Sequence, residues 1–403
     1  MAHLNQKQTL YLLTSIFFIW GVIGGLNDVL VPHLKHVFEL SYTQAVMVQF
    51  VFFTGYLLVS IPASKVINHK GLSYGLLCGL LLIAAGGLLF TPATIKLSYP
   101  LFLLALFVIA AGITFLQVSA NTYVTTLGKA ETASTRLNLS QGFQSIGAFT
   151  APILGGYFIL TTLAPTTGYS EATAITAVQS FYAVISVLLL TFWLIIRKID
   201  LKQPDIHSQE QEITAKGTFD LLIKSKKLSY GAIAIFLYIG AEVSIGSFLI
   251  NFLLEHSEHQ FSQEKAAYFA SLYFMGMIVG RFAGAWLMRI IKAKDMVKVL
   301  ALCAVILSLI TSFADGKIAM YTVLLIGLCN SIMFPTIFTL AIVGLGKFAT
   351  KGAGILCVAI FGGAIIPLCQ GSIADVFGLQ ISFIIPALCF VFIFIYANKY
   401  PNL

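Results

Sequence analysis

Long apolar stretches follow one another along almost the whole chain, with only short polar breaks between them. A helix needs about 20 mainly apolar residues to cross the roughly 30 Å of hydrocarbon in a bilayer. Such segments fold as helices in lipid because every backbone hydrogen bond must be made within the segment. Only 10% of the residues are charged and 58% are hydrophobic, with a mean hydropathy of +0.92. This composition excludes a soluble enzyme and predicts an all-α membrane protein that is solvated by lipid.

The apolar stretches predict twelve transmembrane helices. They fall near residues 11–34, 45–65, 73–91, 98–126, 138–160, 175–196, 229–254, 266–288, 297–314, 318–344, 352–374 and 379–398. The first stretch is too long for a secretory signal and lacks a cleavage site, so we interpret it as a retained helix. One longer polar segment separates six spans from six. The expected organisation is an N-terminal six-helix bundle (1–196), a cytoplasmic linker (197–228) and a C-terminal six-helix bundle (229–403).

Lysine and arginine predict the orientation of these helices, because cytoplasmic loops carry the excess of both residues. If the N-terminus is inside, the cytoplasmic side holds Lys7, Lys65, Lys70, Lys129, Arg136, Arg197, Lys198, Lys202, Lys216, Lys224, Lys226, Lys227, Arg289, Lys292, Lys294, Lys298, Lys347, Lys351 and Lys399. The outer side then holds only Lys35, Lys96, Lys265 and Lys317. Nineteen against four predicts that both termini and the linker are cytoplasmic, in a cell inner membrane. The net charge of +8 is explained by this topology, so we expect no nucleic-acid partner.

Short internal repeats indicate that the two halves are related. Leu127–Lys129 after the fourth span recurs as Leu345–Lys347 after the tenth, and Phe53–Gly55 is echoed by Phe274–Gly276. The offsets of 218 and 221 residues agree closely. Paired six-helix halves are typical of transporters whose substrate binds at the interface near the bilayer midplane. The chain has no GxxxxGK[ST] loop, so ATP is not expected to drive it, and no cofactor is predicted.

One face of the first span carries the first candidate for a coupling-ion site. Gly21, Gly24, Gly25 and Asp28 share a helical stripe, and Asn27 is adjacent. Ionisable residues are costly in hydrocarbon, so those that occur there are candidates for function. The Asp28 carboxylate can take a proton or, with neighbouring oxygens, coordinate Na⁺. A solvated or paired structural role near the outer helix end is the alternative, and no metal other than this possible Na⁺ is predicted.

Amide side chains line one face of each of two neighbouring spans. The fourth span places Thr114, Gln117 and Asn121 at positions i, i+3 and i+7. The fifth span carries Asn138, Gln141, Gln144 and Ser145. Amides both donate and accept hydrogen bonds, which suits the hydroxyls of a neutral sugar better than a charged substrate. Hydrogen bonding that merely holds the helices together is the alternative.

The second half offers a further carboxylate and further polar groups. Tyr238 and Glu242 lie at i and i+4 in the seventh span, and Asn330 lies in the tenth. Glu242 is the second coupling-ion candidate, and Tyr238 and Asn330 are candidate substrate ligands. Arg281 in the eighth span is either a structural partner of Glu242 or a lock nearer the cytoplasmic end. In the same span Gly276, Gly280 and Gly284 recur every four residues, which favours close helix packing.

Six segments spread along the chain together resemble one known family. They are Gly25–Lys35 (GLNDVLVPHLK), Leu116–Asn121 (LQVSAN), Arg136–Gln141 (RLNLSQ), Tyr238–Val243 (YIGAEV), Gly246–Leu249 (GSFL) and Asn330–Phe338 (NSIMFPTIF). The chain resembles the fucose-galactose-glucose permease family of the major facilitator superfamily over nearly its whole length. This resemblance implies a major facilitator fold with two six-helix halves.

The resemblance also implies hexose uptake coupled to a cation gradient, with Asp28 at the family's essential first-span aspartate. Fucose permeases carry a glutamate where this chain has Gln117, and their seventh span lacks the Gly-Ala-Glu pattern found here. Both features resemble the glucose/galactose permease branch. Since Gln117 cannot titrate, either Asp28 handles H⁺ alone, or Asp28 and Glu242 serve a Na⁺-coupled cycle. Thr122 also replaces the proline that the family usually shows there.

The resulting hypothesis is a cation-coupled symporter for glucose, galactose or a related hexose that works by alternating access. Its hexose ligands would be Gln117, Asn121, Gln141, Gln144, Tyr238 and Asn330, and its ion would bind Asp28 with Asn27 and Glu242. The alternatives are a fucose-type proton symporter, a uniporter or exporter of the same fold and, from another class, a membrane-embedded enzyme. The dispersed intramembrane amides argue against the enzyme. Nothing in the sequence requires more than a monomer.

Overall fold

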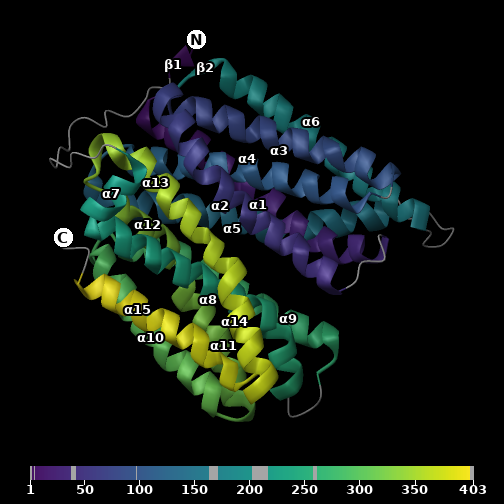
Figure 1. Ribbon diagram of the computed structural model, residues 1–403, viewed down its shortest axis with the longest axis vertical. Helices are drawn as coiled ribbons and strands as arrows, with labels where there is room; N and C mark the ends of the chain where they lie inside the picture. The colour runs from purple at the N-terminus through teal and green to yellow at the C-terminus, as the bar shows by residue number, and fades with distance from the viewer. Residues whose placement is uncertain are drawn as a thin grey trace. The chain divides into compact units, whose positions relative to one another are not determined.

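The computed structural model describes the backbone of residues 2–3, 5–37, 42–96, 98–162, 171–201, 217–256 and 261–399. Within these ranges it describes all side chains except those of residues 2–3, 26–37, 42–46, 152–162, 171–178, 181, 200 and 263. Nearly all of the described chain is helical (Figure 1). Two strands of two residues each, β1 (Ala2–His3) and β2 (Ile199–Asp200), pair in parallel and hold the N-terminus beside the end of α6.

Backbone contacts divide the chain into two compact units. The first unit comprises residues 1–127 and 143–205, and the second comprises residues 128–142 and 206–403. The helices that begin in the first unit are α1 (Gln6–Val37), α2 (Tyr42–Lys70), α3 (Leu72–Ile95), α4 (Tyr99–Thr126) and α6 (Glu171–Arg197). Helix α5 (Ala133–Thr162) contributes residues up to Gly142 to the second unit and the rest to the first.

The second unit holds the remaining helices. They are α7 (Thr218–Lys224), α8 (Lys226–His256), α9 (Gln263–Leu287), α10 (Ala293–Phe313), α11 (Gly316–Asn330), α12 (Met333–Ile342), α13 (Ala349–Val358), α14 (Gly362–Phe377) and α15 (Ile384–Lys399). Short 3₁₀ turns precede or link some of them, at Ala130–Thr132, Gly346–Phe348, Ala359–Phe361 and Ile381–Phe383.

Ten segments among the described residues are long and apolar enough to cross a membrane. They correspond to ten of the twelve predicted spans. Helices α5 and α6, 30 and 27 residues long, occupy the positions of the other two, and many of their side chains fall outside the described set. The predicted tenth span is divided into α11 and α12, and the predicted eleventh into α13 and α14 with a 3₁₀ turn between them.

Small residues let the helices of the first unit pack backbone to backbone. Helix α4 lies between α3 and α2, and α6 covers another side of α3. A Cβ atom added to Gly79 of α3 would lie 2.8 Å from the Gly112 carbonyl oxygen of α4, and one added to Gly112 would lie 2.7 Å from the Gly79 oxygen. Real Cβ atoms do not approach that closely, so the two glycines permit this helix contact. Among the described spans α1 to α4, helix α4 is the most enclosed.

In the second unit, α8 is the central helix. It contacts α14, α15, α12 and α9, while α10 lies beside α15 and α11 (Figure 1). The predicted glycine stripe on α9 meets α11, which confirms its role in close packing. A Cβ atom at Gly276 would come within 3.2 Å of the Leu328 nitrogen, and one at Gly280 would overlap the Ser331 side chain. These contacts bring α9 against the junction of α11 and α12.

Candidate functional site

Helix α1 carries the first coupling-ion candidates close to α5. A Cβ atom at Gly25 would lie 2.9 Å from the Ala148 Cα atom, and one at Gly21 would overlap the Gln144 carbonyl oxygen. Gly21 and Gly25 of α1 therefore pack on the part of α5 that carries Gln144. Asn27 and Asp28 follow this contact within the same helix, but their side chains lie outside the described residues. Gln144 itself is half-buried.

The polar face of α4 is enclosed in the first unit. Thr114 and Asn121 are fully buried and Gln117 is 5% exposed. The Thr114 hydroxyl donates to the Ala110 carbonyl within its own helix (2.8 Å). Among the described residues, neither the nitrogen nor the oxygen of the Asn121 amide has a hydrogen-bond partner. Burying an amide without hydrogen-bond partners lowers stability by about 1–3 kcal/mol in mutational measurements. The Asn121 amide is therefore available to bond a ligand or water at this position.

The first part of α5 places its amides in the second unit. Asn138 is fully buried, and its amide nitrogen donates to the Ser134 carbonyl (2.9 Å) and the Thr336 hydroxyl (3.0 Å). Gln141, three residues further on, is 2% exposed. Its backbone carbonyl accepts a hydrogen bond from Arg281 Nη1 (3.1 Å). Sequence reasoning placed Gln141 and Gln144 on one face of one helix, and the structure assigns these two residues to different compact units.

Tyr238 and Asn330 meet in the core of the second unit. The Tyr238 hydroxyl donates to the Asn330 carbonyl (2.9 Å), and the Asn330 amide nitrogen donates to the Tyr273 hydroxyl (2.8 Å). All three residues are fully buried, and the amide oxygen of Asn330 has no partner in the part of the chain that the structure describes. In this conformation the hydroxyl of Tyr238 and the amide nitrogen of Asn330 are thus engaged with protein groups. Sequence reasoning missed Tyr273, whose aromatic character in an apolar helix gave no signal.

Glu242 lies one helical turn beyond Tyr238 on α8 and is half-buried. Arg281 of α9 and Tyr238 are both close enough to interact with it electrostatically. A carboxylate in an apolar span needs such partners, because an isolated charge there is expensive. Arg281 is within electrostatic range of Glu242, and its role as a structural partner or as a lock stays a prediction. Arg281 also bonds the carbonyls of Gln141 and Ser331, contacts that the sequence left open.

Long apolar helices that carry buried amides and an intramembrane carboxylate define a polytopic membrane protein of the transporter class. Residues 12–358 match the family model described as Major Facilitator Superfamily. The chain belongs to the major facilitator superfamily.

Relatives with assigned names cover almost the whole chain. A "Glucose/galactose transporter" of Brucella abortus (strain 2308) is 46% identical over 97% of this chain and 94% of its own length. A "Putative glucose/galactose transporter" of Helicobacter pylori (strain ATCC 700392 / 26695) is 37% identical over 96% of this chain and 95% of its own. The "L-fucose-proton symporter" of Escherichia coli (strain K12) is 33% identical, with 96% and 92% covered.

A solved structure agrees with these sequence relationships. A crystal structure of the E. coli fucose:proton symporter, in a single-residue variant, superposes with a TM-score of 0.87 at 32% identity, over 97% of this chain and 98% of that one. The predicted resemblance to the fucose-galactose-glucose permeases is confirmed by these names and by this likeness. The predicted all-α, twelve-helix major facilitator fold is confirmed with it.

Proposed function

We propose that the chain is a secondary active hexose transporter of the glucose/galactose type, a cation-coupled symporter that works by alternating access. The observation that carries the proposal is the 46% identity to a protein named glucose/galactose transporter, maintained over 97% of the chain. The polar groups within the spans fit this substrate class. Five of the six candidate ligands are amides, and amides match the paired donors and acceptors of sugar hydroxyls.

The proposed sugar ligands are Gln117, Asn121, Gln141, Gln144, Tyr238 and Asn330. The amide atoms of Asn121 and the amide oxygen of Asn330, which have no partner among the described residues, support this assignment, because a buried polar group without a partner is stabilised when a ligand or water supplies one. Each hydrogen bond so gained contributes about 0.5–1.5 kcal/mol. Four or five such bonds suffice for the modest affinity that a transporter needs in order to release its substrate.

The proposed coupling ion is H⁺, held at Asp28 with help from Asn27 and Glu242. Two relatives named L-fucose-proton symporters, at 33% and 30% identity, support H⁺ over Na⁺. Gln117 cannot titrate, so Asp28 and Glu242 are the candidate carboxylates that can bind the proton. Coupling requires the protonated state to bind sugar more tightly than the deprotonated state, by a differential affinity of a few kcal/mol.

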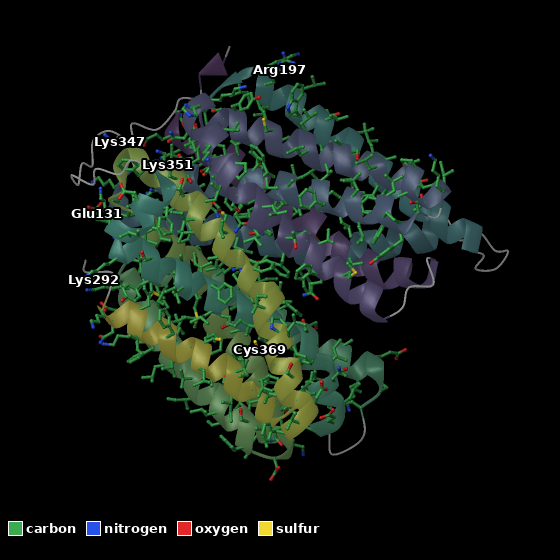
Figure 2. The ribbon with its side chains drawn as sticks, in the orientation of Figure 1. Glu131, Arg197, Lys292, Lys347, Lys351 and Cys369 are labelled. Carbon is green, nitrogen blue, oxygen red and sulfur yellow. The ribbon has the colours of Figure 1, made fainter. Side chains whose placement is uncertain are left out.

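The proposed topology places both termini and the linker in the cytoplasm of the cell, with the protein in the inner membrane as a monomer. Lysine distribution supports it: Figure 2 shows Lys292, Lys347 and Lys351 at one end of the second unit, the end where α7 and α13 lie. The proposed division remains two six-helix bundles, residues 1–196 and 229–403, with residues 197–228 as the linker.

Uptake of radiolabelled glucose into proteoliposomes tests the function. An inward proton gradient or, separately, an inward sodium gradient is imposed, and unlabelled galactose or L-fucose competes. We expect accumulation driven by the proton gradient and inhibition by galactose more than by L-fucose. Asp28→Asn lowers accumulation roughly tenfold or more, because an amide cannot take a proton. Asp375→Asn, at an exposed position on α14, serves as the matched control. If glucose equilibrates across the membrane at a rate that does not depend on either ion gradient, the protein is a uniporter and not a symporter.

A further inference from the structure

The junction of α11 and α12 leaves one backbone carbonyl without its helical donor. Helix α11 ends at Asn330, α12 begins at Met333, and Ser331 and Ile332 form the turn between them. The Ser331 carbonyl would accept a hydrogen bond from residue 335 in a continuous helix. That residue is Pro335, which has no N–H group. Ser331 is 1% exposed, so another protein group must supply the donor.

Arg281 supplies that donor from α9. Its Nε–H donates to the Ser331 carbonyl (3.0 Å), and its Nη1–H donates to the Gln141 carbonyl of α5 (3.1 Å). The guanidinium is planar and has five N–H donors, so it can bond two carbonyls at once. Gly280 and Gly284 allow the approach, since a Cβ atom at either would overlap Ser331 or Ile332. One side chain thereby joins three helices.

The carbonyls of Gln141 and Ser331 differ in whether another donor remains when the hydrogen bond from Arg281 is broken. Gln141 lies inside the regular helix α5, where the N–H of residue 145 is its helical donor. The Gln141 carbonyl therefore stays satisfied without Arg281. The Ser331 carbonyl has no helical substitute, and leaving it buried and unpaired weakens the junction of α11 and α12. Breaking the hydrogen bond between Arg281 and Ser331 therefore costs more free energy than breaking the one between Arg281 and Gln141, so the bond to Gln141 opens first.

We propose that Arg281 is a positioning residue that forms a releasable latch. Ser331 anchors the guanidinium, and its bond to Gln141 holds the first part of α5 against α9 and opens once in each transport cycle. The latch rests on the proposed function, since on the proposed topology it lies in the cytoplasmic half of α5 and α9. Glu242 remains within electrostatic reach of Arg281, so the cation keeps a counter-charge while the latch is open.

Thiol labelling of purified protein, without any sugar, tests the latch. Ser134→Cys is introduced into a variant whose native cysteines are replaced by serine or alanine. Ser134 is 5% exposed and lies in the first part of α5, so its labelling by a maleimide reports separation of α5 from its neighbours. We expect Arg281→Gln to raise the labelling rate about tenfold, the effect of losing one charge-assisted hydrogen bond. Arg289→Gln, exposed beyond the end of α9, leaves the rate unchanged.

A double-mutant cycle with Pro335→Ala tests the anchor. Alanine restores the N–H group at residue 335, so the Ser331 carbonyl no longer depends on Arg281. Arg281→Gln is expected to lower the melting temperature in the presence of Pro335 and to have little effect in the Pro335→Ala background. Arg281→Lys keeps the charge and is expected to give an intermediate labelling rate. It replaces Arg281→Gln in both experiments if the glutamine variant does not fold.

Two results would overturn the proposal. They are an unchanged labelling rate in Arg281→Gln, and an equal loss of melting temperature in both backgrounds. Neither measurement uses a substrate, so a wrong assignment of the sugar or the ion changes the uptake assay and leaves these results as they are.

Discussion

Asn121 and Asn138 are both fully buried asparagines, but their environments differ. Within the described residues, the amide of Asn121 has no partner at nitrogen or oxygen, whereas Asn138 lacks a partner only at its amide oxygen and its amide nitrogen donates to Ser134 and Thr336. An amide that is buried without partners has lost its hydration and gained no bond in return. We infer that Asn121 is kept at the expense of stability, which is common where a residue serves function.

Leucine substitution at these two positions separates stability from function. Asn121→Leu, of similar volume, is expected to leave the free energy of unfolding unchanged or to raise it by about 1 kcal/mol, because no hydrogen bond is lost. Asn138→Leu is expected to lower it by about 1–3 kcal/mol, because the buried Thr336 hydroxyl loses the amide donor of Asn138. Melting of detergent-solubilised protein, followed by tryptophan fluorescence, measures both. A clear loss of stability in Asn121→Leu would show that Asn121 has a structural partner.

Helix α4 owes its position to backbone contact with α3, a property of the element as a whole. Its amides face away from this contact, since Gly112 and Asn121 lie on roughly opposite sides of the helix. The close contact therefore fixes the direction in which Gln117 and Asn121 point. The amide periodicity predicted this polar face from the sequence. It did not predict how completely the face is enclosed, because enclosure depends on helices that are distant in the chain.

A single added methyl group at the contact tests its tightness. Gly112→Ala places a Cβ atom 2.7 Å from the Gly79 oxygen, so the helices must move apart. We expect a loss of about 1–3 kcal/mol in stability and a lower melting temperature. Gly24→Ala in α1, where no described atom lies within 4 Å of the added Cβ atom, is the matched control and should be neutral or slightly stabilising. Equal effects of the two substitutions would contradict the packing described for α3 and α4.

At the scale of the whole molecule, the positions and order of the ten apolar spans found among the described residues could be predicted from apolar length alone. Bilayer thickness imposes that length on every span, so each span can be recognised from its own run of apolar residues. The interruption of the tenth span was not predicted, although Pro335 marked it. The hydrogen bond from Arg281 to the Ser331 carbonyl could not be predicted from one helix alone. It depends on the approach of α9 and on the backbone N–H group that Pro335 lacks. Residue 281 was predicted as a partner or a lock, but the backbone carbonyls it bonds could not be read from side-chain identities.

Orientation in the membrane is a property of the whole molecule and can be measured with single cysteines. Lys292→Cys, in the turn before α10, is expected to react with a membrane-impermeant maleimide only from the cytoplasmic side. Lys96→Cys, at the end of α3, is expected to react only from the outer side. Both lysines are exposed. Labelling of whole cells against inside-out vesicles makes the comparison, and the reverse pattern would invert the proposed topology.

The junction of α11 and α12 also bears on how such sequences diverge. Because Pro335 removes the donor that Arg281 replaces, the two residues form one chemical unit although they are 54 positions apart. A lineage that regains an N–H group at position 335 relaxes the requirement for a guanidinium at position 281, while loss of the guanidinium alone is penalised. Substitution histories should therefore show the proline lost before the arginine, and the order of those two events can be read from reconstructed ancestors.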